Sequence, residues 1–310
     1  MKIAVIGVGG VGGYFGGRLA QHFDTAFISR GSTYEAIKAN GLKVASINGD
    51  FHINPVNVSD NYSTVGPVSL VLVCVKSQQV EQIIDEMAPL VGEDTIILPL
   101  LNGVDAIDQL QNKYGNHVIG GFCRIISFKV APGVINHRAS TPIVDIGEVS
   151  GPVTQRIRNV EQLFKTANIV INTHDNFLPA QWFKMVFICV TSGIGAVTRS
   201  TFGEYREIHE VRDMVTQACQ EGMAIAASCG AKLSDEFPSQ ILGAIDSLAY
   251  DGTTSMQRDI QDGNPSEIDY LLGSLVRVAK QNNINAPLTS FLYYSLLPQE
   301  FKAREISKKT

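Results

Sequence analysis

Three glycines near the start of the chain have the spacing that binds the phosphates of a dinucleotide. Residues 2–6 read as a short apolar strand, and G-x-G-x-x-G follows at Gly7, Gly9 and Gly12. The first glycine allows the turn, the second lets backbone amides approach a pyrophosphate, and the third lets the next helix pack closely. A glycine-rich loop without a ligand is the alternative. The residues expected to contact the cofactor are Gly7, Val8, Gly9, Gly10, Val11 and Gly12.

The end of the second expected strand, residues 25–30, distinguishes between the two nicotinamide dinucleotides. About 20 residues after the glycines, NAD-binding enzymes carry an Asp or Glu that binds the ribose 2′-hydroxyl. Ser29 and Arg30 stand there instead, so no carboxylate repels a 2′-phosphate and Arg30 can pair with one. NADP(H) is therefore favoured over NAD(H), the alternative being an arginine that ends a strand in solvent.

One cation, Lys184, interrupts the apolar helical segment at residues 182–190. Desolvation lowers the pKa of a lysine ammonium toward the range in which it donates a proton near neutral pH. Lys184 is therefore a candidate acid. The alternative is a lysine whose stem follows the core while its ammonium reaches water.

A second polar cluster lies at residues 253–269. Ser255 supplies a hydroxyl, and Glu267 supplies a carboxylate at the expected start of a helix over 266–281. Both have structural alternatives: Ser255 as a turn hydroxyl, and Glu267 as an acid that interacts favourably with the helix dipole. Ser266 and Asp269 also have the spacing of a capping box.

Lys76 and Asn102 each follow an expected parallel strand, at residues 68–75 and 95–101. Ligands of open α/β sheets bind at the carboxyl ends of the strands, so both residues belong on the same rim as the glycine loop. A lysine that ends a strand and an Asn-Gly turn are the structural alternatives.

The elements that must position these residues change character near residue 174. Before it, strands and helices alternate, and the nearly continuous apolar strands are typical of a parallel sheet covered on both faces, with antiparallel strands added late. After it, the apolar spacing is helical. We expect an α/β fold with a dinucleotide-binding domain at 1–174 and an all-helical domain at 175–310. Helices are expected at 79–90, 153–167, 181–191, 205–228, 239–248 and 266–281.

The composition limits the function classes. The net charge of −5 argues against nucleic acid and acidic membranes as partners, which leaves a small metabolite. The five cysteines are odd in number and have no C-x-x-C pair, so we expect mostly buried thiols and no metal site. No secretory signal is evident, and the apolar stretch at 185–198 is too short to span a bilayer. A soluble, cytoplasmic protein is expected.

These motifs, in this order and spacing, resemble the ketopantoate reductase (2-dehydropantoate 2-reductase) family over essentially the whole chain. The specific elements are W-x-K at residues 182–184, S-M at 255–256 and E-I-D at 267–269. The resemblance implies an N-terminal Rossmann-type domain and a C-terminal helical domain. It also implies NADPH as cofactor and the reduction of 2-dehydropantoate to D-pantoate in pantothenate biosynthesis.

The resemblance also implies a role for each candidate. Lys184 is similar to the acid that protonates the carbonyl oxygen, and Glu267 to the carboxylate that orients it. Ser255 is similar to the hydroxyl that holds the substrate carboxylate. Asn102 corresponds to an amide near the nicotinamide and the substrate, while Arg30 would hold the 2′-phosphate. Lys76 would lie on the cofactor side, and a homodimer follows only by analogy of architecture.

The chain departs from the family four and eight residues after the lysine, where the family has Asn and this chain has Ile188 and Ser192. Ser192 can bind a substrate hydroxyl, whereas Ile188 would leave one unpaired, at about 1–3 kcal/mol. A 2-keto acid is therefore better supported than 2-dehydropantoate itself. The alternatives are a D-2-hydroxyacid dehydrogenase for branched or aromatic 2-keto acids, and an NADP-sensing protein without turnover.

Overall fold

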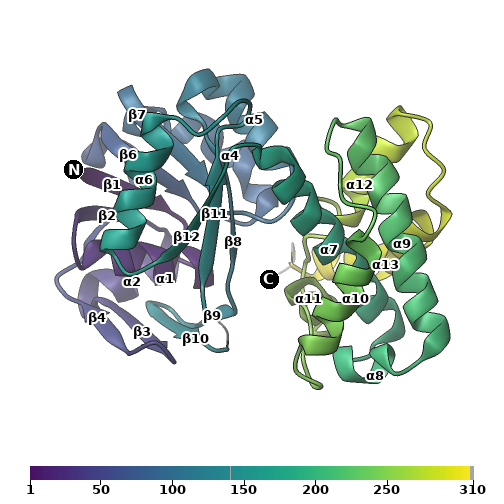
Figure 1. Cartoon of the computed structure of the whole chain (residues 1–310). Coiled ribbons are helices and arrows are strands. Elements are labelled where there is room, and N and C mark those ends of the chain that lie inside the picture. The colour runs from purple at the N-terminus through teal and green to yellow at the C-terminus, as the bar shows by residue number, and fades with distance from the viewer. Residues whose placement is uncertain (140, 308–310) are drawn as a thin grey trace. The chain divides into compact units, whose positions relative to one another are not determined.

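A computed structural model of the chain describes residues 1–139 and 141–307. The chain divides into two compact units, which Figure 1 draws in purple to teal and in green to yellow. Unit 1 consists of Met1–Asn102 and Ala106–Phe177, and unit 2 of Gly103–Asp105 and Leu178–Thr310. Each unit is described by itself below.

The centre of unit 1 is a five-stranded parallel sheet in the order β5-β2-β1-β6-β7. Ala4 in the middle strand is fully buried and pairs with Ala26 on one side and Val71 on the other. The expected Rossmann-type sheet is confirmed. The strands are β1 (Lys2–Ile6), β2 (Asp24–Ile28), β5 (Asn57–Ser59), β6 (Val68–Val73) and β7 (Val91–Pro99).

The expected helix at 79–90 is shorter in the structure. The helix α4 ends at Glu86, and a separate 3-10 turn, η2, covers Ala88–Leu90. Pro89 in this turn has no N–H to continue the helical hydrogen bonds, which explains the break. The helices and 3-10 turns of unit 1 are α1 (Gly10–Ala20), α2 (Gly31–Asn40), α3 (Tyr62–Val65), η1 (Ser77–Gln79), α4 (Val80–Glu86), η2, α5 (Asp105–Tyr114), η3 (Gly115–His117) and α6 (Gln155–Thr166).

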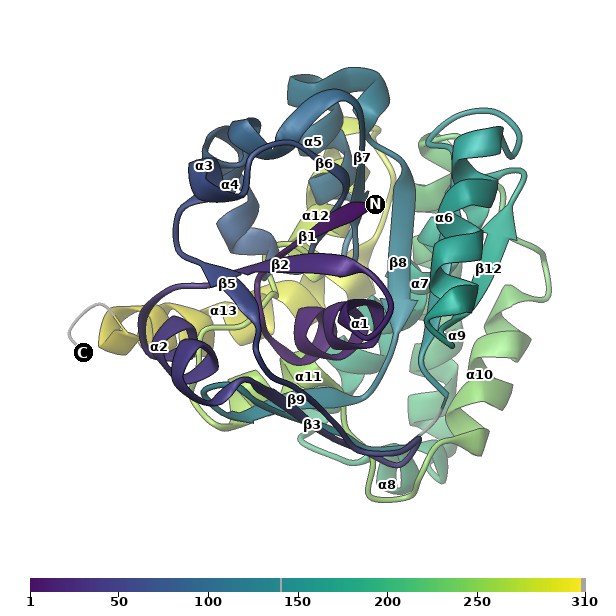
Figure 2. The same cartoon turned by 90° about the vertical axis from the view of Figure 1, so that its left-hand side faces the viewer.

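Two smaller mixed sheets complete unit 1, and they include the antiparallel pairs that we expected late in this part of the chain. Their strand orders are β4-β3-β10-β9 and β12-β11-β8, with β9–β10 and β8–β11 antiparallel. Figure 2 shows α1 between the five-stranded sheet and β3 and β9. The strands are β3 (Leu42–Ser46), β4 (Phe51–Ile53), β8 (Gly120–Arg124), β9 (Ser127–Ala131), β10 (Val134–His137), β11 (Ile143–Gly147) and β12 (Val170–His174).

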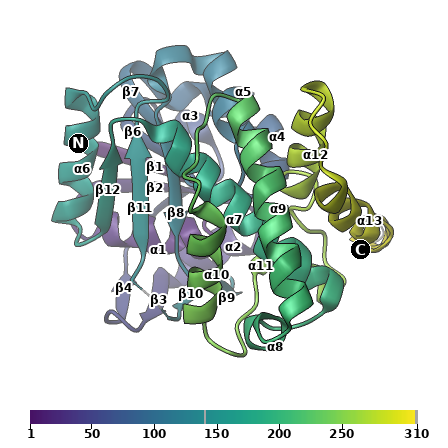
Figure 3. The same cartoon turned by 45° about the vertical axis from the view of Figure 1, so that its right-hand side comes forward.

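Unit 2 is helical, as expected, and Figure 3 shows α9 and α10 side by side. Three expected helices differ. The helix expected at 181–191 extends over 177–198, residues 205–228 form α8 and α9 with a break at 207–208, and the helix expected from Ser266 begins at Leu272. Cys189, Ile194 and Leu296 belong to its buried core. The helices are α7 (Phe177–Thr198), α8 (Phe202–Arg206), α9 (His209–Ser228), α10 (Phe237–Ser247), α11 (Ser255–Gln261), α12 (Leu272–Gln281) and α13 (Pro287–Ser307).

Two expectations from composition are modified by the structure. All five cysteines lie among the described residues and form no disulfide, but Cys229 at the end of α9 is exposed rather than buried. Within the described part of the chain, α7 alone has the length and apolar composition to cross a membrane. Of the apolar 18-residue stretch of α7 that meets these criteria, 67% is buried inside the protein. Buried core helices of globular proteins have the same length and composition.

Candidate functional site

The glycine loop between β1 and α1 is packed too tightly for larger residues at three positions. Gly7 has φ +92°, and a Cβ on it would lie 2.9 Å from the carbonyl oxygen of Cys74. A Cβ on Gly12 would lie 2.0 Å from the carbonyl oxygen of Gly7, and one on Gly10 2.2 Å from that of Ser127. The first and third glycines of the motif are therefore required by the backbone itself.

Gly9 has the opposite environment, since a Cβ there would meet no atom within 4 Å. Gly9 is the N-cap of α1 and has no side chain to cap the first turn of the helix, which also contains no acidic residue. The N–H groups of that turn are thus available to an anion. Of the two valines in the motif, Val8 is buried and Val11 half-buried. An open cradle at a helix N-terminus fits a pyrophosphate.

Lys76 and Asn102 lie at the carboxyl edge of the parallel sheet, as expected. Lys76 is exposed three residues after β6 ends, and Asn102 is half-buried after β7. The Ser77 hydroxyl donates a hydrogen bond to the carbonyl oxygen of Asn102 at 3.0 Å and joins the two segments. Because β1, β6 and β7 are neighbouring strands, both segments share the edge that carries the glycine loop.

Arg30 follows β2 and is the N-cap of α2, where it forms an ion pair that the sequence did not predict. Its Nη2 lies 2.5 Å from Oε2 of Glu86 at the end of α4, and the side chains are 49% and 35% exposed. A second cation, Lys129, donates to the hydroxyl of Thr33 in the first turn of α2 at 3.1 Å. The separation of 56 positions between Arg30 and Glu86 explains why no local pattern revealed this pair.

The helix α7 carries Lys184, Ile188 and Ser192 on one face, because residues four apart on a helix stack one above another. Lys184 and Ile188 are half-buried. Ser192 is fully buried, and its Oγ has no hydrogen-bond partner among the described residues. An unpaired buried hydroxyl is unusual in a folded protein, so Ser192 is a position to which a bound water or ligand group could add a partner.

Ser255 is exposed and is the first residue of α11, rather than part of a turn. Thr254 caps this helix, because its Oγ1 accepts a hydrogen bond from the Gln257 N–H at 3.2 Å. Gln257 was missed from sequence: its Nε2 donates to the Ser200 carbonyl at 2.8 Å, and its Oε1 is buried without a partner among the described residues. A Cβ on Gly195 would lie 2.5 Å from that Oε1, so α11 packs closely against α7.

Glu267 is half-buried in a turn five residues before α12, so the prediction that it starts a helix is wrong. The expected capping box does not form either. The N–H and hydroxyl of Ser266 instead donate to Oε2 of Glu300 in α13, at 3.0 Å and 2.6 Å. Glu300 is only 1% exposed, and a buried carboxylate requires such donors.

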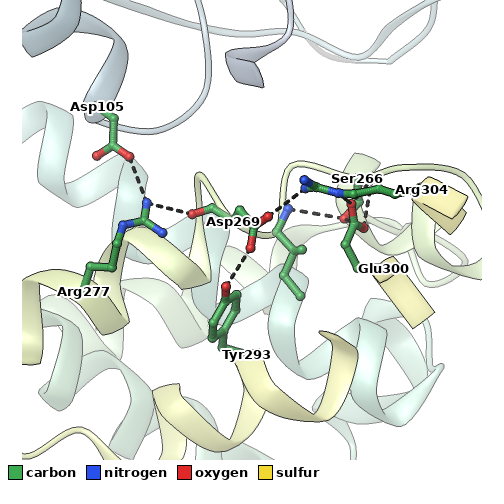
Figure 4. Close-up of polar contacts among 8 residues, drawn as sticks. Asp105, Ser266, Asp269, Arg277, Tyr293, Glu300 and Arg304 are labelled. Carbon is green, nitrogen blue, oxygen red and sulfur yellow. Dashed lines mark hydrogen bonds and ion pairs between the residues drawn. The ribbon is translucent and has the colours of Figure 1, made fainter. Parts of the chain in front are cut away.

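A polar network holds the segment that carries Glu267, and Figure 4 shows its members pointing toward Asp269 and Glu300. Arg304 lies 2.6 Å from Glu300 and 2.8 Å from Asp269. The Tyr293 hydroxyl donates to Asp269 at 2.6 Å, and Arg277 donates to the Asp269 carbonyl at 2.9 Å. Burial, together with the hydrogen bond to Asp269, raises the pKa of Tyr293 to about 12, so it remains a neutral donor.

The candidates are thus divided between the units. Within the described residues, no cluster of three or more His, Cys, Asp or Glu side chains could hold a metal ion. Unit 1 contains the six-residue glycine loop, Arg30, Lys76 and Asn102, and unit 2 contains Lys184, Ser192, Ser255 and Glu267.

Comparison with known proteins gives a consistent result across the chain. The family model "Ketopantoate reductase PanE/ApbA" matches residues 3–151, and "Ketopantoate reductase PanE/ApbA C terminal" matches 176–300. A 2-dehydropantoate 2-reductase of Nostoc sp. is 28% identical, with 95% of this chain and 94% of the relative covered. The crystal structure of 2-dehydropantoate 2-reductase from Geobacter metallireducens GS-15 is 30% identical, with a TM-score of 0.90 and coverage of 96% and 99%.

A likeness in fold extends to an enzyme with another substrate. The ternary structure of D-mandelate dehydrogenase with NADH and anilino(oxo)acetate has a TM-score of 0.88 at 21% identity. The alignment covers 98% of this chain and 99% of that one. At this identity the comparison describes the architecture alone.

Proposed function

Since the chain belongs to the ketopantoate reductase family, we propose that it uses NADPH to reduce a 2-keto acid to a D-2-hydroxy acid. The simplest such reaction is 2-dehydropantoate to D-pantoate, in pantothenate biosynthesis. The observation that carries this proposal is Lys184, a half-buried cation on the face of α7 that also holds Ile188 and Ser192. A cation at such a position can stabilise negative charge that develops on a carbonyl oxygen.

The cofactor part of the proposal rests on unit 1. The open cradle at Gly9 accommodates a pyrophosphate. The exposed cation Arg30 is the N-cap of α2, and the exposed Lys129 of β9 contacts Thr33 in the first turn of α2, so both can pair with a 2′-phosphate bound there. Lys76 lies on the same sheet edge. When bound, NADPH supplies the hydride.

The chemical part rests on unit 2, with Asn102 from unit 1. Lys184 donates a proton to the carbonyl oxygen and stabilises its alkoxide character more in the transition state than in the ground state. Glu267 pairs with Lys184 and orients it. Ser255 binds the substrate carboxylate, and the amide of Asn102 serves near the nicotinamide and the substrate. Ser192 is proposed as a further substrate contact.

Ile188 favours a second candidate within the same reaction class, a D-2-hydroxyacid dehydrogenase for branched or aromatic 2-keto acids. Its half-buried apolar side chain lies one helical turn from Lys184 and offers no partner to a substrate hydroxyl. An NADP sensor without turnover is disfavoured, because Lys184, Glu267 and Ser255 are all present.

Steady-state kinetics with a panel of keto acids tests these alternatives. We expect 2-dehydropantoate to be reduced with a higher kcat/KM than 2-ketoisovalerate or phenylpyruvate, and NADPH to be preferred over NADH. Equal or faster reduction of the other two keto acids would favour the second candidate. Absence of turnover with every keto acid and both nucleotides, in a protein that binds NADPH, would identify a sensor.

The proposal also covers the cellular location and the oligomeric state of the enzyme. The burial of most of the apolar stretch of α7 inside the protein supports a soluble protein, and we place it in the cytoplasm with its metabolite substrate. A homodimer is proposed by analogy with enzymes of this architecture. Sedimentation equilibrium of the purified protein measures the oligomeric state directly.

A further inference from the structure

The ion pair between Arg30 and Glu86 joins two elements that border the proposed nucleotide site in unit 1. Arg30 stands at the carboxyl end of β2, and Glu86 is the last residue of α4. Their closest atoms are 2.5 Å apart, and both side chains are substantially exposed. An exposed pair of this kind contributes little to stability, so a ligand can replace either partner.

The surroundings make Glu86 the specific partner of Arg30. The adjacent carboxylate of Asp85 pairs with Lys113 at 2.6 Å instead. Tyr62, which is 6% exposed, lies near the pair, where burial and the charge of Glu86 raise the pKa of its hydroxyl to about 12. Tyr62 is therefore neutral, and the negative charge beside Arg30 comes from Glu86.

The two forms of the cofactor need opposite groups at this position. A 2′-phosphate binds arginine and is repelled by a carboxylate, whereas a ribose 2′-hydroxyl donates a hydrogen bond to a carboxylate. In NAD-binding enzymes that carboxylate ends the second strand. Here Arg30 follows the second strand, which ends at Ile28, and the structure brings in a carboxylate from α4.

We propose that Glu86 sets the cofactor preference by competing with the 2′-phosphate of NADPH for Arg30. With NADH, the Glu86 carboxylate accepts the hydrogen bond of the ribose 2′-hydroxyl. Glu86 therefore narrows the preference for NADPH over NADH. This inference rests on the proposed function, in which Arg30 lies at the 2′ position of the cofactor.

The test uses the full-length protein and two nucleotide fragments, 2′,5′-ADP and 5′-AMP, titrated by calorimetry. In Glu86→Gln we expect the Kd of 2′,5′-ADP to fall about fivefold and that of 5′-AMP to rise about two- to threefold, because its 2′-hydroxyl loses a charged acceptor. The KM of NADPH should fall relative to that of NADH. Asp85→Asn is the matched control, because it removes the same charge from the same helix without contacting Arg30, and should change neither Kd by more than about twofold.

Two outcomes would overturn the role of Glu86: an unchanged ratio of the two Kd values in Glu86→Gln, or an equal change in Asp85→Asn. Arg30→Ala tests the premise separately. This substitution should raise the Kd of 2′,5′-ADP at least about tenfold and that of 5′-AMP much less, since the guanidinium pairs with the 2′-phosphate. Equal weakening of the binding of both fragments would reject Arg30 as the 2′-phosphate ligand. If Arg30→Ala weakens mainly 2′,5′-ADP, as expected, but Glu86→Gln changes neither Kd, only the role of Glu86 is rejected.

Discussion

At the scale of single residues, Lys184 is the most direct test of the proposed chemistry. Lys184→Ala removes the half-buried ammonium from α7 and leaves the glycine loop of unit 1 intact. We expect kcat to fall by about 100- to 10,000-fold, the usual contribution of a positioned acid, while the Kd of NADPH stays within about twofold. Steady-state rates and a fluorescence titration with NADPH measure both quantities.

The control for this prediction is Lys232→Ala, which removes an exposed lysine from the same unit and should leave kcat unchanged. A kcat within about tenfold of the unmodified protein would show that Lys184 is not the proton donor. A large loss of NADPH affinity in Lys184→Ala would instead indicate that Lys184 binds the cofactor.

Residues that stand out from their neighbours could be identified from sequence, whereas their partners could not. Lys184 is a cation in an apolar segment, and Arg30 replaces an expected acid. Glu86 and Glu300 carry no such signal, because each is an ordinary acid on an ordinary helix. Each becomes significant only when the fold brings it to Arg30 or to Ser266.

At the scale of elements, α13 positions the segment that carries Glu267. Glu300 in α13 accepts hydrogen bonds from the Ser266 N–H and hydroxyl and from Arg304. In Glu300→Gln we expect unit 2 to lose about 3 kcal/mol of unfolding free energy, because the Arg304 guanidinium and the two Ser266 donors lose a buried anionic acceptor. We also expect kcat to fall about tenfold with an unchanged Kd for NADPH, since Glu267 is displaced.

Glu305→Gln is the matched control for this prediction, because it makes the same change on an exposed part of α13. It should alter neither urea unfolding nor kcat. If Glu300→Gln is destabilised but keeps its full kcat, the network stabilises the fold without positioning Glu267.

The strand β11 carries a buried carboxylate that makes the stability of unit 1 depend on pH. Asp145 is 3% exposed and accepts hydrogen bonds from His174, Asn172 and Arg124 at 2.9–3.0 Å. Burial alone would raise the pKa of Asp145, but these partners outweigh it and hold the pKa below 3.8. The ionised form therefore favours the folded state. Its contribution is complete above pH 3.8 and is lost as the pH falls through the lowered pKa.

Asp145→Asn should accordingly lower the unfolding free energy by about 3 kcal/mol at pH 7, because its donors lose a buried anion. The difference from the unmodified protein should shrink as the pH falls through the lowered pKa of Asp145, where Asp145 itself becomes protonated. Urea unfolding at several pH values measures this difference in unfolding free energy. Asp94→Asn, at an exposed position of unit 1, is the control and should show neither effect. If the difference in unfolding free energy between Asp145→Asn and the unmodified protein grew toward low pH, the stabilising role of ionised Asp145 would be contradicted.

The types of element could be read from the spacing of apolar residues, but several boundaries could not. The buried parallel strands and the long helices of unit 2 have strong periodicity. The start of α12 was expected at Ser266, because S-x-x-D is a local capping signal. The distant Glu300 takes the Ser266 hydroxyl instead, so a tertiary contact overrides the local one.

At the scale of the whole molecule, the described residues form two separate hydrophobic cores, one in each unit. The short segment Gly103–Asp105 belongs to unit 2, although the residues on both sides of it belong to unit 1. This could not be predicted from sequence, since three residues are too few to show a pattern. Val104 belongs to the core of unit 2, and the Ser274 hydroxyl donates to Asp105 at 2.7 Å. Separate cores are expected to unfold in separate transitions.

Ligand-dependent calorimetry tests whether unit 1 alone binds the nucleotide end of the cofactor. At about 100 times its Kd, 2′,5′-ADP should stabilise its binding unit by about 2.7 kcal/mol, which raises the Tm of a domain of this size by about 5–10 °C. This fragment lacks the nicotinamide, so the transition of unit 2 should stay within about 1 °C. Equal shifts of both transitions would contradict a binding site confined to unit 1, because a ligand stabilises only the structure that must be folded to bind it.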